Sequence, residues 1–202
     1  MRLATVVVLD PGHGGPDAGC IALHGAWQEK RWTLQMAQLA QDECAARWES
    51  LSVELTRDGD EFVPLSARAR LARHLRADLV IAIHVDAFAD THAKGSRAFW
   101  LSEDARPYAE HLASHMPSEL RRKHNGAVRA TVADWPRVVN VLQQHSTIPA
   151  ILIECGYSTN AHDFDALRDP MICAGIAKAI AETAHLAHAT KEASDVRQLT
   201  TH

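Results

Sequence analysis

Short apolar runs alternate along the chain with longer stretches of helical periodicity, a pattern typical of an α/β sheet with helices on both faces. Several runs are apolar throughout, as expected for strands covered on both sides. Six strands are predicted, at Ala4–Leu9, Leu51–Thr56, Asp78–His84, Ser96–Leu101, Val138–Leu142 and Ala150–Glu154. The expected fold is therefore α/β: a single domain with a twisted, mostly parallel (mixed) sheet of about six strands.

Three of the intervening stretches predict helices. Gln28–Trp48 carries apolar residues at helical spacing with few breakers, and Pro64–Leu75 opens with a proline, which the first turn of a helix tolerates. A closing helix should dock on the sheet through an apolar stripe. That stripe comprises Ile172, Ile176, Ala179, Ile180 and Ala184.

The length and the ends of the chain fit one domain. The chain has 202 residues, of which 47% are hydrophobic, enough for one sizeable core. Residues 1–190 should form that domain, and residues 191–202 are polar and aperiodic, so we expect a flexible tail. The apolar run near Met1 is too short to span a membrane and no small-residue cleavage site follows it. We expect a buried strand there, no export signal and no second domain.

Charge and cysteine content exclude several classes of function. Lys and Arg number 21 against 25 Asp and Glu, which gives a net charge of −4 and argues against a nucleic-acid partner. The four cysteines show no CxxC pairing or tight spacing, so we expect reduced thiols rather than a thiolate metal site or a disulfide framework.

Polar residues with candidate chemistry lie where predicted strands end. His13 follows the first strand in a glycine-lined turn, and His84 and Glu154 end two further strands. Open α/β sheets place their ligands at this edge. Each residue also has a plainer explanation: a turn histidine, a hydrogen-bonded structural histidine, or a paired carboxylate.

Glu29 begins the long helix, where a carboxylate often serves only as a partner of the helix dipole. A short connection from the first strand would nevertheless return Glu29 to the edge that carries His13. Two imidazoles and one carboxylate leave one tetrahedral position of a zinc ion open for water, and a second carboxylate could move that water's proton. Spacing alone leaves open whether Glu29 or Glu154 binds the metal.

Five segments, in this order, resemble the type-3 family of zinc-dependent N-acetylmuramoyl-L-alanine amidases. They are DPGHGGPDAG at Asp10–Gly19, EK at Glu29-Lys30, LTRDGD at Leu55–Asp60, ADLVIAIHVDA at Ala77–Ala87 and PAILIECGYSTN at Pro149–Asn160.

The resemblance implies zinc ligands at His13, Glu29 and His84 and a catalytic glutamate at Glu154. It also implies cleavage of the amide that joins the lactyl group of N-acetylmuramic acid to the L-alanine of the peptide stem. Peptidoglycan would then be the substrate, with Zn²⁺ as the cofactor.

The chain departs from the family pattern at a few positions. Asp86 and Arg73 stand where asparagine is usual, and Tyr157–Asn160 replaces a turn that usually contains Phe. Asp86 is only two residues beyond His84, so it could orient the His84 ring without itself binding the metal. For Arg68, a structural ion pair is at least as good an interpretation as a catalytic role.

The resemblance also suggests a biological setting. The segment between His84 and Glu154 is too short for the helical plug of some bacterial relatives, so we expect free access and no activator. The expected role is that of a monomeric phage or prophage endolysin, made in the host cytoplasm without a signal peptide and not integral to the membrane. Holin or spanin genes alongside would favour this role.

Three alternatives remain open. The sequence could be the catalytic domain of a longer, exported wall-remodelling enzyme. It could also be a zinc carboxypeptidase or deacetylase, because such enzymes also use two histidines and two carboxylates. A non-enzymatic peptidoglycan-binding regulator would be expected to lack a ligand or the glutamate, and all four positions are filled here.

Overall fold

The computed structural model describes residues 4–21, 27–124 and 126–200. Its described strands form one sheet in the order β2-β1-β3-β6-β4-β5, in which only the β4–β6 pair is antiparallel. The strands are β1 (Thr5–Pro11), β2 (Leu51–Leu55), β3 (Leu79–Asp86), β4 (Arg97–Trp100), β5 (Ala127–Arg129) and β6 (Ala150–Tyr157). The predicted α/β fold with a mixed, mostly parallel sheet is confirmed.

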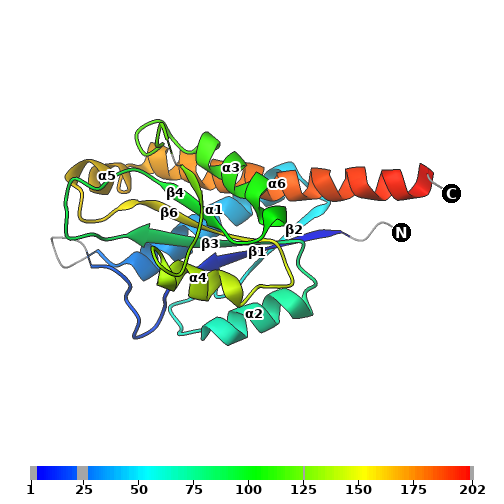
Figure 1. Ribbon diagram of the computed structural model, residues 1–202, viewed down its shortest axis with the longest axis horizontal. Coiled ribbons are helices and arrows are strands. Elements are labelled where there is room, and N and C mark those ends of the chain that lie inside the picture. Colours follow the sequence, from blue (N-terminus) through cyan, green and yellow to red (C-terminus); the bar gives the residue numbers. More distant parts are fainter. Residues whose placement is uncertain (1–3, 22–26, 125, 201–202) are drawn as a thin grey trace.

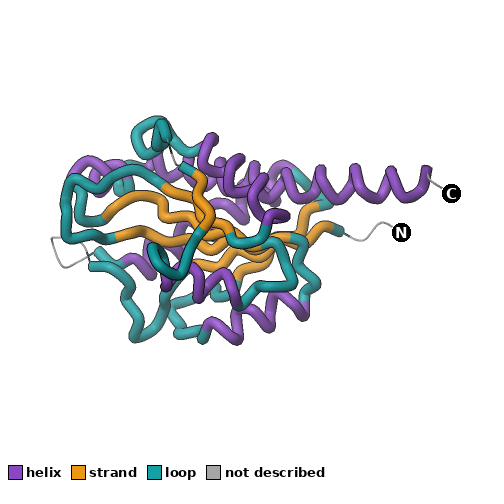
Figure 2. Tube along the Cα trace, in the orientation of Figure 1, coloured by secondary structure: helices purple, strands orange, loops and turns teal. Residues whose placement is uncertain are grey.

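Helices cover both faces of this sheet (Figures 1 and 2). One face packs against α1, α3 and α6, and the other against α2 and α4. The helices are α1 (Glu29–Arg47), α2 (Leu65–His74), a 3-10 turn η1 (Glu103–Ala105), α3 (Arg106–His115), α4 (Pro136–Gln143), α5 (Ala161–Ala166) and α6 (Pro170–Thr200). The long helix, the second helix and the closing helix follow the predicted order, whereas α3 and α5 were not predicted.

The predicted strand at Val138–Leu142 is wrong, because this run lies within α4. A strand would place Asn140 on the same face as Val138 and Leu142, yet Asn140 is exposed and the other two are buried. Burial of Val138, Val139 and Leu142 follows helical spacing instead. The last place in the sheet belongs to β5, a strand of three residues that is too short for a periodic signal.

The C-terminal helix extends further than expected. Helical backbone continues past Thr190 to Thr200, where the sequence predicts a frayed tail. Residues 191–200 contain neither Gly nor Pro and include several good helix formers, which explains the continuation. Figure 1 shows the last turns of α6 projecting beyond the sheet.

Two further expectations concern the sulfur chemistry and the membrane. All four cysteines are free thiols, as predicted. Within residues 4–21, 27–124 and 126–200, none of the helices combines the length and the apolar character that a membrane crossing requires.

Docking of α6 on the sheet yields a stability prediction. Ile180 is fully buried in the core between α6 and the sheet, so Ile180→Ala should lower the free energy of unfolding by about 2–5 kcal/mol in urea titration. Met171 on the same helix is 85% exposed, and Met171→Ala should change the free energy of unfolding by less than about 0.5 kcal/mol. Equal effects of the two substitutions would contradict the described packing.

Candidate metal centre and active site

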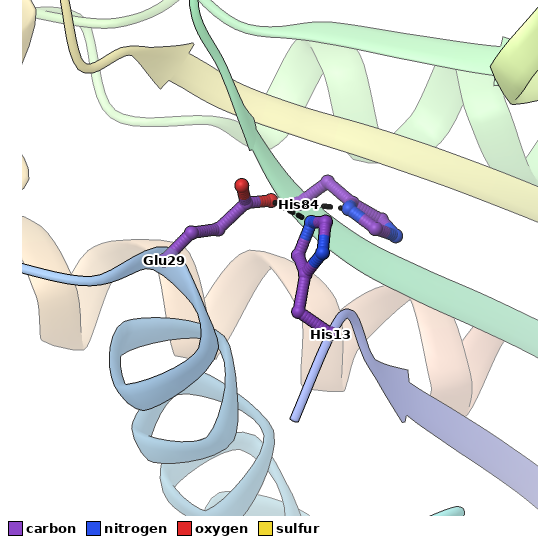
Figure 3. A group of neighbouring side chains, drawn as sticks. All are labelled: His13, Glu29 and His84. Carbon is purple, nitrogen blue, oxygen red and sulfur yellow. Dashed lines mark hydrogen bonds and ion pairs between the residues drawn. The ribbon is translucent and has the colours of Figure 1, made fainter. Parts of the chain in front are cut away.

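The candidate site lies where β1, β3 and β6 reach the same edge of the sheet. These strands are parallel neighbours, so their carboxyl ends meet. His13 follows β1, His84 lies on β3, and Glu154 of β6 stands opposite His84 in register. Glu29 is the first residue of α1, and its side chain reaches the two histidines (Figure 3). The predicted convergence of polar strand ends is therefore present.

His13, Glu29 and His84 form a compact group of potential metal ligands, with one ligand atom from each within 4.8 Å of the others. Glu29 Oε1 lies 3.0 Å from His13 Nε2 and 3.1 Å from His84 Nδ1. The two imidazole rings are nearly perpendicular, at 81°, with centroids 5.0 Å apart. Two nitrogens and one oxygen thus point to a common centre (Figure 3).

The Glu29 carboxylate is buried, with 3% of the residue exposed, and both of its oxygens accept hydrogen bonds. The backbone N–H of Cys20 donates to Oε2 at 2.8 Å, and that of Val85 donates to Oε1 at 2.9 Å. Burial would raise the pKa of Glu29, but hydrogen bonds and charge from His13 and His84 outweigh it and lower the pKa. Glu29 is therefore held ionised, as a metal ligand must be.

His13 is oriented by a carboxylate that the sequence analysis missed. Its Nδ1 lies 2.9 Å from Asp17 Oδ2, which leaves Nε2 directed at Glu29. Burial lowers the pKa of His13, but Glu29 and Asp17 more than compensate and raise it. Metal-binding histidines commonly donate their other nitrogen to a carboxylate in this way. A carboxylate four residues after His13 in the same turn was the available signal.

The turn around His13 has a constrained backbone. His13 itself has φ +65°, a left-handed conformation that is uncommon outside glycine. A Cβ at Gly12 would lie 2.3 Å from His84 Cε1, so glycine is required for the His84 ring to rest over the backbone. Gly19 has φ +68°, and a Cβ there would lie 2.5 Å from Glu29 Oε2. Both glycines make room for the side chains of the candidate ligands His84 and Glu29.

Arg57 joins the two segments that carry His13 and Glu29. Its guanidinium is buried and donates to the carbonyls of Pro11 at 3.0 Å, Gly12 at 2.8 Å and Lys30 at 2.7 Å. The first two carbonyls belong to the last residue of β1 and to the turn before His13, and the third follows Glu29 in α1. Arg57 therefore fixes the distance between the turn and the helix.

Arg68 makes the structural ion pair considered from the sequence. Its Nη1 lies 2.6 Å from Asp10 Oδ1, and both side chains are buried. Asp10 also accepts from the Thr56 hydroxyl, and Arg68 Nη2 donates to the His13 carbonyl at 2.7 Å. Because its donors are used by protein groups, Arg68 stabilises the backbone around the candidate ligand His13 and is not free to bind substrate.

Glu154 differs from Glu29 in its surroundings. Its Oε2 is buried and has no hydrogen-bond partner in the part of the chain that the structure describes. Burial is the main cause that raises the pKa of Glu154 well above its usual range, and the negative charges of Asp86 and Glu29 raise it further. A carboxylate with raised proton affinity and an unused oxygen suits proton transfer.

A cavity of about 730 Å³ connects these groups. His13, Glu29, His84 and Glu154 all line it, and so does Asp86. The register between β3 and β6 shifts between His84 and Asp86, and burial raises the pKa of Asp86. Asp86 thus faces the same cavity, beside the candidate ligands.

The residues present fit a divalent metal with an open coordination position. Two imidazole nitrogens and one carboxylate oxygen make up a donor set that catalytic zinc sites use, and the unpartnered Glu154 oxygen lies at the same cavity. Fold and site together define an α/β protein with a candidate metal site at the carboxyl edge of its sheet.

A family model described as N-acetylmuramoyl-L-alanine amidase matches residues 7–185. The chain belongs to this family, which confirms the resemblance inferred from its motifs.

Individual relatives agree with this assignment. The chain is 30% identical over 166 residues to the probable cell wall amidase LytH of Staphylococcus saprophyticus, covering 82% of this chain and 52% of that protein. It is 30% identical over 180 residues to a germination-specific N-acetylmuramoyl-L-alanine amidase of Bacillus subtilis, covering 82% and 72%. A solved N-acetylmuramoyl-L-alanine amidase from Clostridium difficile 630 superposes with TM-score 0.82 at 25% identity, covering 94% and 100%. The chain spans about half the length of LytH.

The contact between His13 and Asp17 yields a prediction about metal affinity. Asp17→Ala removes the partner of His13 Nδ1, so zinc affinity should fall about 10- to 100-fold in competition with a chelating dye. Asp17→Asn keeps a hydrogen-bond acceptor for His13 and should lose less zinc affinity than Asp17→Ala. Asp42, exposed on α1, is the control, and Asp42→Ala should bind zinc as the wild type does. Wild-type affinity in Asp17→Ala would show that Asp17 does not orient the ligand.

Proposed function

We propose that the protein is a zinc-dependent N-acetylmuramoyl-L-alanine amidase. It hydrolyses the amide between the lactyl group of N-acetylmuramic acid and the L-alanine of the peptide stem in peptidoglycan. The observation that carries this proposal is the His13, Glu29 and His84 donor set beside the unpartnered carboxylate oxygen of Glu154, in a member of the amidase family.

The two glutamates take different roles because their surroundings differ. Both Glu29 oxygens are held by backbone N–H groups, and Oε1 faces the two histidines, which suits a fixed ligand. Glu154 has a free buried oxygen and a raised pKa, which suits a group that gains and loses a proton. These observations support Glu29 as the ligand and Glu154 as the acid/base, the choice that spacing alone left open.

The protein's own residues have two separate tasks in this reaction, metal binding and proton transfer. Zinc, when bound, supplies Lewis acidity toward the scissile carbonyl and the attacking water. His13, Glu29 and His84 hold it, and Asp17 keeps His13 in the tautomer that presents Nε2. Glu154 accepts a proton from the water at Oε2 and returns it to the departing amine of alanine.

The helices around the cavity support the expectation that substrate can reach the site without displacement of a blocking helix. Between His84 and Glu154, the described helices are η1, α3 and α4. α3 packs with α6 on the opposite face of the sheet, and of these three described helices α4 alone contributes residues to the cavity lining. Independence from an activator and a role as a phage or prophage endolysin made in the host cytoplasm stay predictions.

Product analysis tests the proposed reaction. Purified sacculi treated with the zinc-loaded protein should release peptides with new L-alanine amino termini and leave glycan strands intact. Chelation should abolish release and added zinc should restore it. Release of terminal D-alanine would indicate a carboxypeptidase, and release of acetate a deacetylase. Either outcome, or unchanged activity after verified metal removal, would contradict the proposal.

A further inference from the structure

Arg97 lies beside the candidate active site and has no part in the mechanism described above. It begins β4 and stands opposite Glu154 in the antiparallel β4–β6 pair, while Glu154 stands opposite His84 on its other side. Residues directly opposite one another point to the same face of a sheet. His84, Glu154 and Arg97 therefore form a row across three neighbouring strands.

The donors of Arg97 are unused by the described part of the protein. Its Nε is buried without a hydrogen-bond partner, and no ion pair within 4.0 Å involves its guanidinium among those residues. Arg57 and Arg68, in contrast, use their guanidinium groups in several hydrogen bonds. A buried donor without a partner is unfavourable, so an acceptor supplied from outside would be bound favourably.

Two aromatic side chains of the cavity lining, Phe99 and Trp135, lie beside the Arg97 guanidinium. Its central carbon lies 5.5 Å from the ring centroid of Trp135 and 5.9 Å from that of Phe99. Both rings line the cavity, as does Asp86. Arginine stacked on aromatic faces keeps its planar fork of N–H groups available for a carboxylate.

The charges around Arg97 also favour an anion. Burial and the neighbouring Arg122 guanidinium lower the pKa of Arg97, while Tyr157 and Asp86 act in the opposite direction. Arg122 is anchored nearby, with Nε donating to the Gly95 carbonyl at 3.3 Å and its guanidinium 5.9 Å from the Tyr157 ring. The positive charges of Arg97 and Arg122 thus lie close enough to repel one another, and a bound anion would offset that repulsion.

We propose that Arg97, assisted by the charge of Arg122, binds a free carboxylate on the stem residue that follows the alanine. The inference rests on the proposed amidase function and specifies its substrate: stems with an acidic second residue are preferred over stems in which that carboxylate is a carboxamide. A carboxylate pairs with the guanidinium fork through two parallel hydrogen bonds, which a carboxamide cannot provide.

The spacing agrees with this assignment. Neighbouring strands lie about 4.8 Å apart, so the Arg97 backbone is about 10 Å from that of His84. In an extended peptide, a carboxylate on the second residue lies roughly 6–7 Å from the amide nitrogen of the first. An amide at the metal centre therefore places that carboxylate within reach of the Arg97 side chain.

The test compares two muramoyl-peptides that differ only in a carboxylate or a carboxamide on the second residue. The zinc-loaded wild type should cleave the carboxylate form with kcat/KM about 10- to 100-fold higher, and Arg97→Gln should bring the ratio close to one, chiefly by raising KM. Arg97→Met, which preserves apolar packing on Phe99 and Trp135, should do the same. Arg129 is exposed on β5 and stacks on Trp100, so Arg129→Gln should retain the preference.

Each contrary result has a distinct meaning. Cleavage of both substrates without preference by the wild type would overturn this inference and leave the amidase function intact. Arg137 also lines the cavity, so loss of preference in Arg137→Gln but not in the Arg97 variants would overturn the assignment to Arg97. Failure to cleave either substrate would overturn the proposed function, and this inference with it.

Discussion

Burial of the Glu29 carboxylate is the constraint on which the active-site architecture depends. An ionised carboxylate with 3% exposure is tolerated only where donors surround it, and these come from three separate segments of the chain. Cys20 donates from the loop before α1, Val85 from β3, and the two histidines face Oε1 from β3 and the turn after β1. The loop, the strand and the helix must therefore assemble together, and that assembly brings the three candidate metal ligands into one group.

Two buried arginines make this assembly rigid. Arg57 connects the turn before His13 to α1. Arg68, a residue of α2, pairs with Asp10 near the end of β1 and donates to the His13 carbonyl. Removal of either would leave buried carbonyls or a buried carboxylate without a partner. The left-handed backbone of His13 is maintained within this network, where the Arg68 guanidinium holds its carbonyl.

The sequence predicted those parts of the site that depend on strand direction. His84 and Glu154 could be placed together because parallel strands end at one edge, and the structure pairs them in register. Glu29 required family resemblance, because its position depends on the loop before α1. Arg97 was missed because only the antiparallel pairing of β4 with β6 brings it beside Glu154. Likewise, the β-branched residues that dominate Val138–Leu142 predict a strand, but the run folds as part of α4.

The division of roles between the two glutamates is tested most directly by Glu154→Gln, with bound zinc and sacculus hydrolysis measured on the same preparation. Glutamine preserves the shape of the side chain and removes its capacity to take a proton. Zinc content should equal that of the wild type, and hydrolysis should fall by about 10²- to 10⁴-fold. Loss of zinc from this variant would contradict the account, because it would make Glu154 a metal ligand.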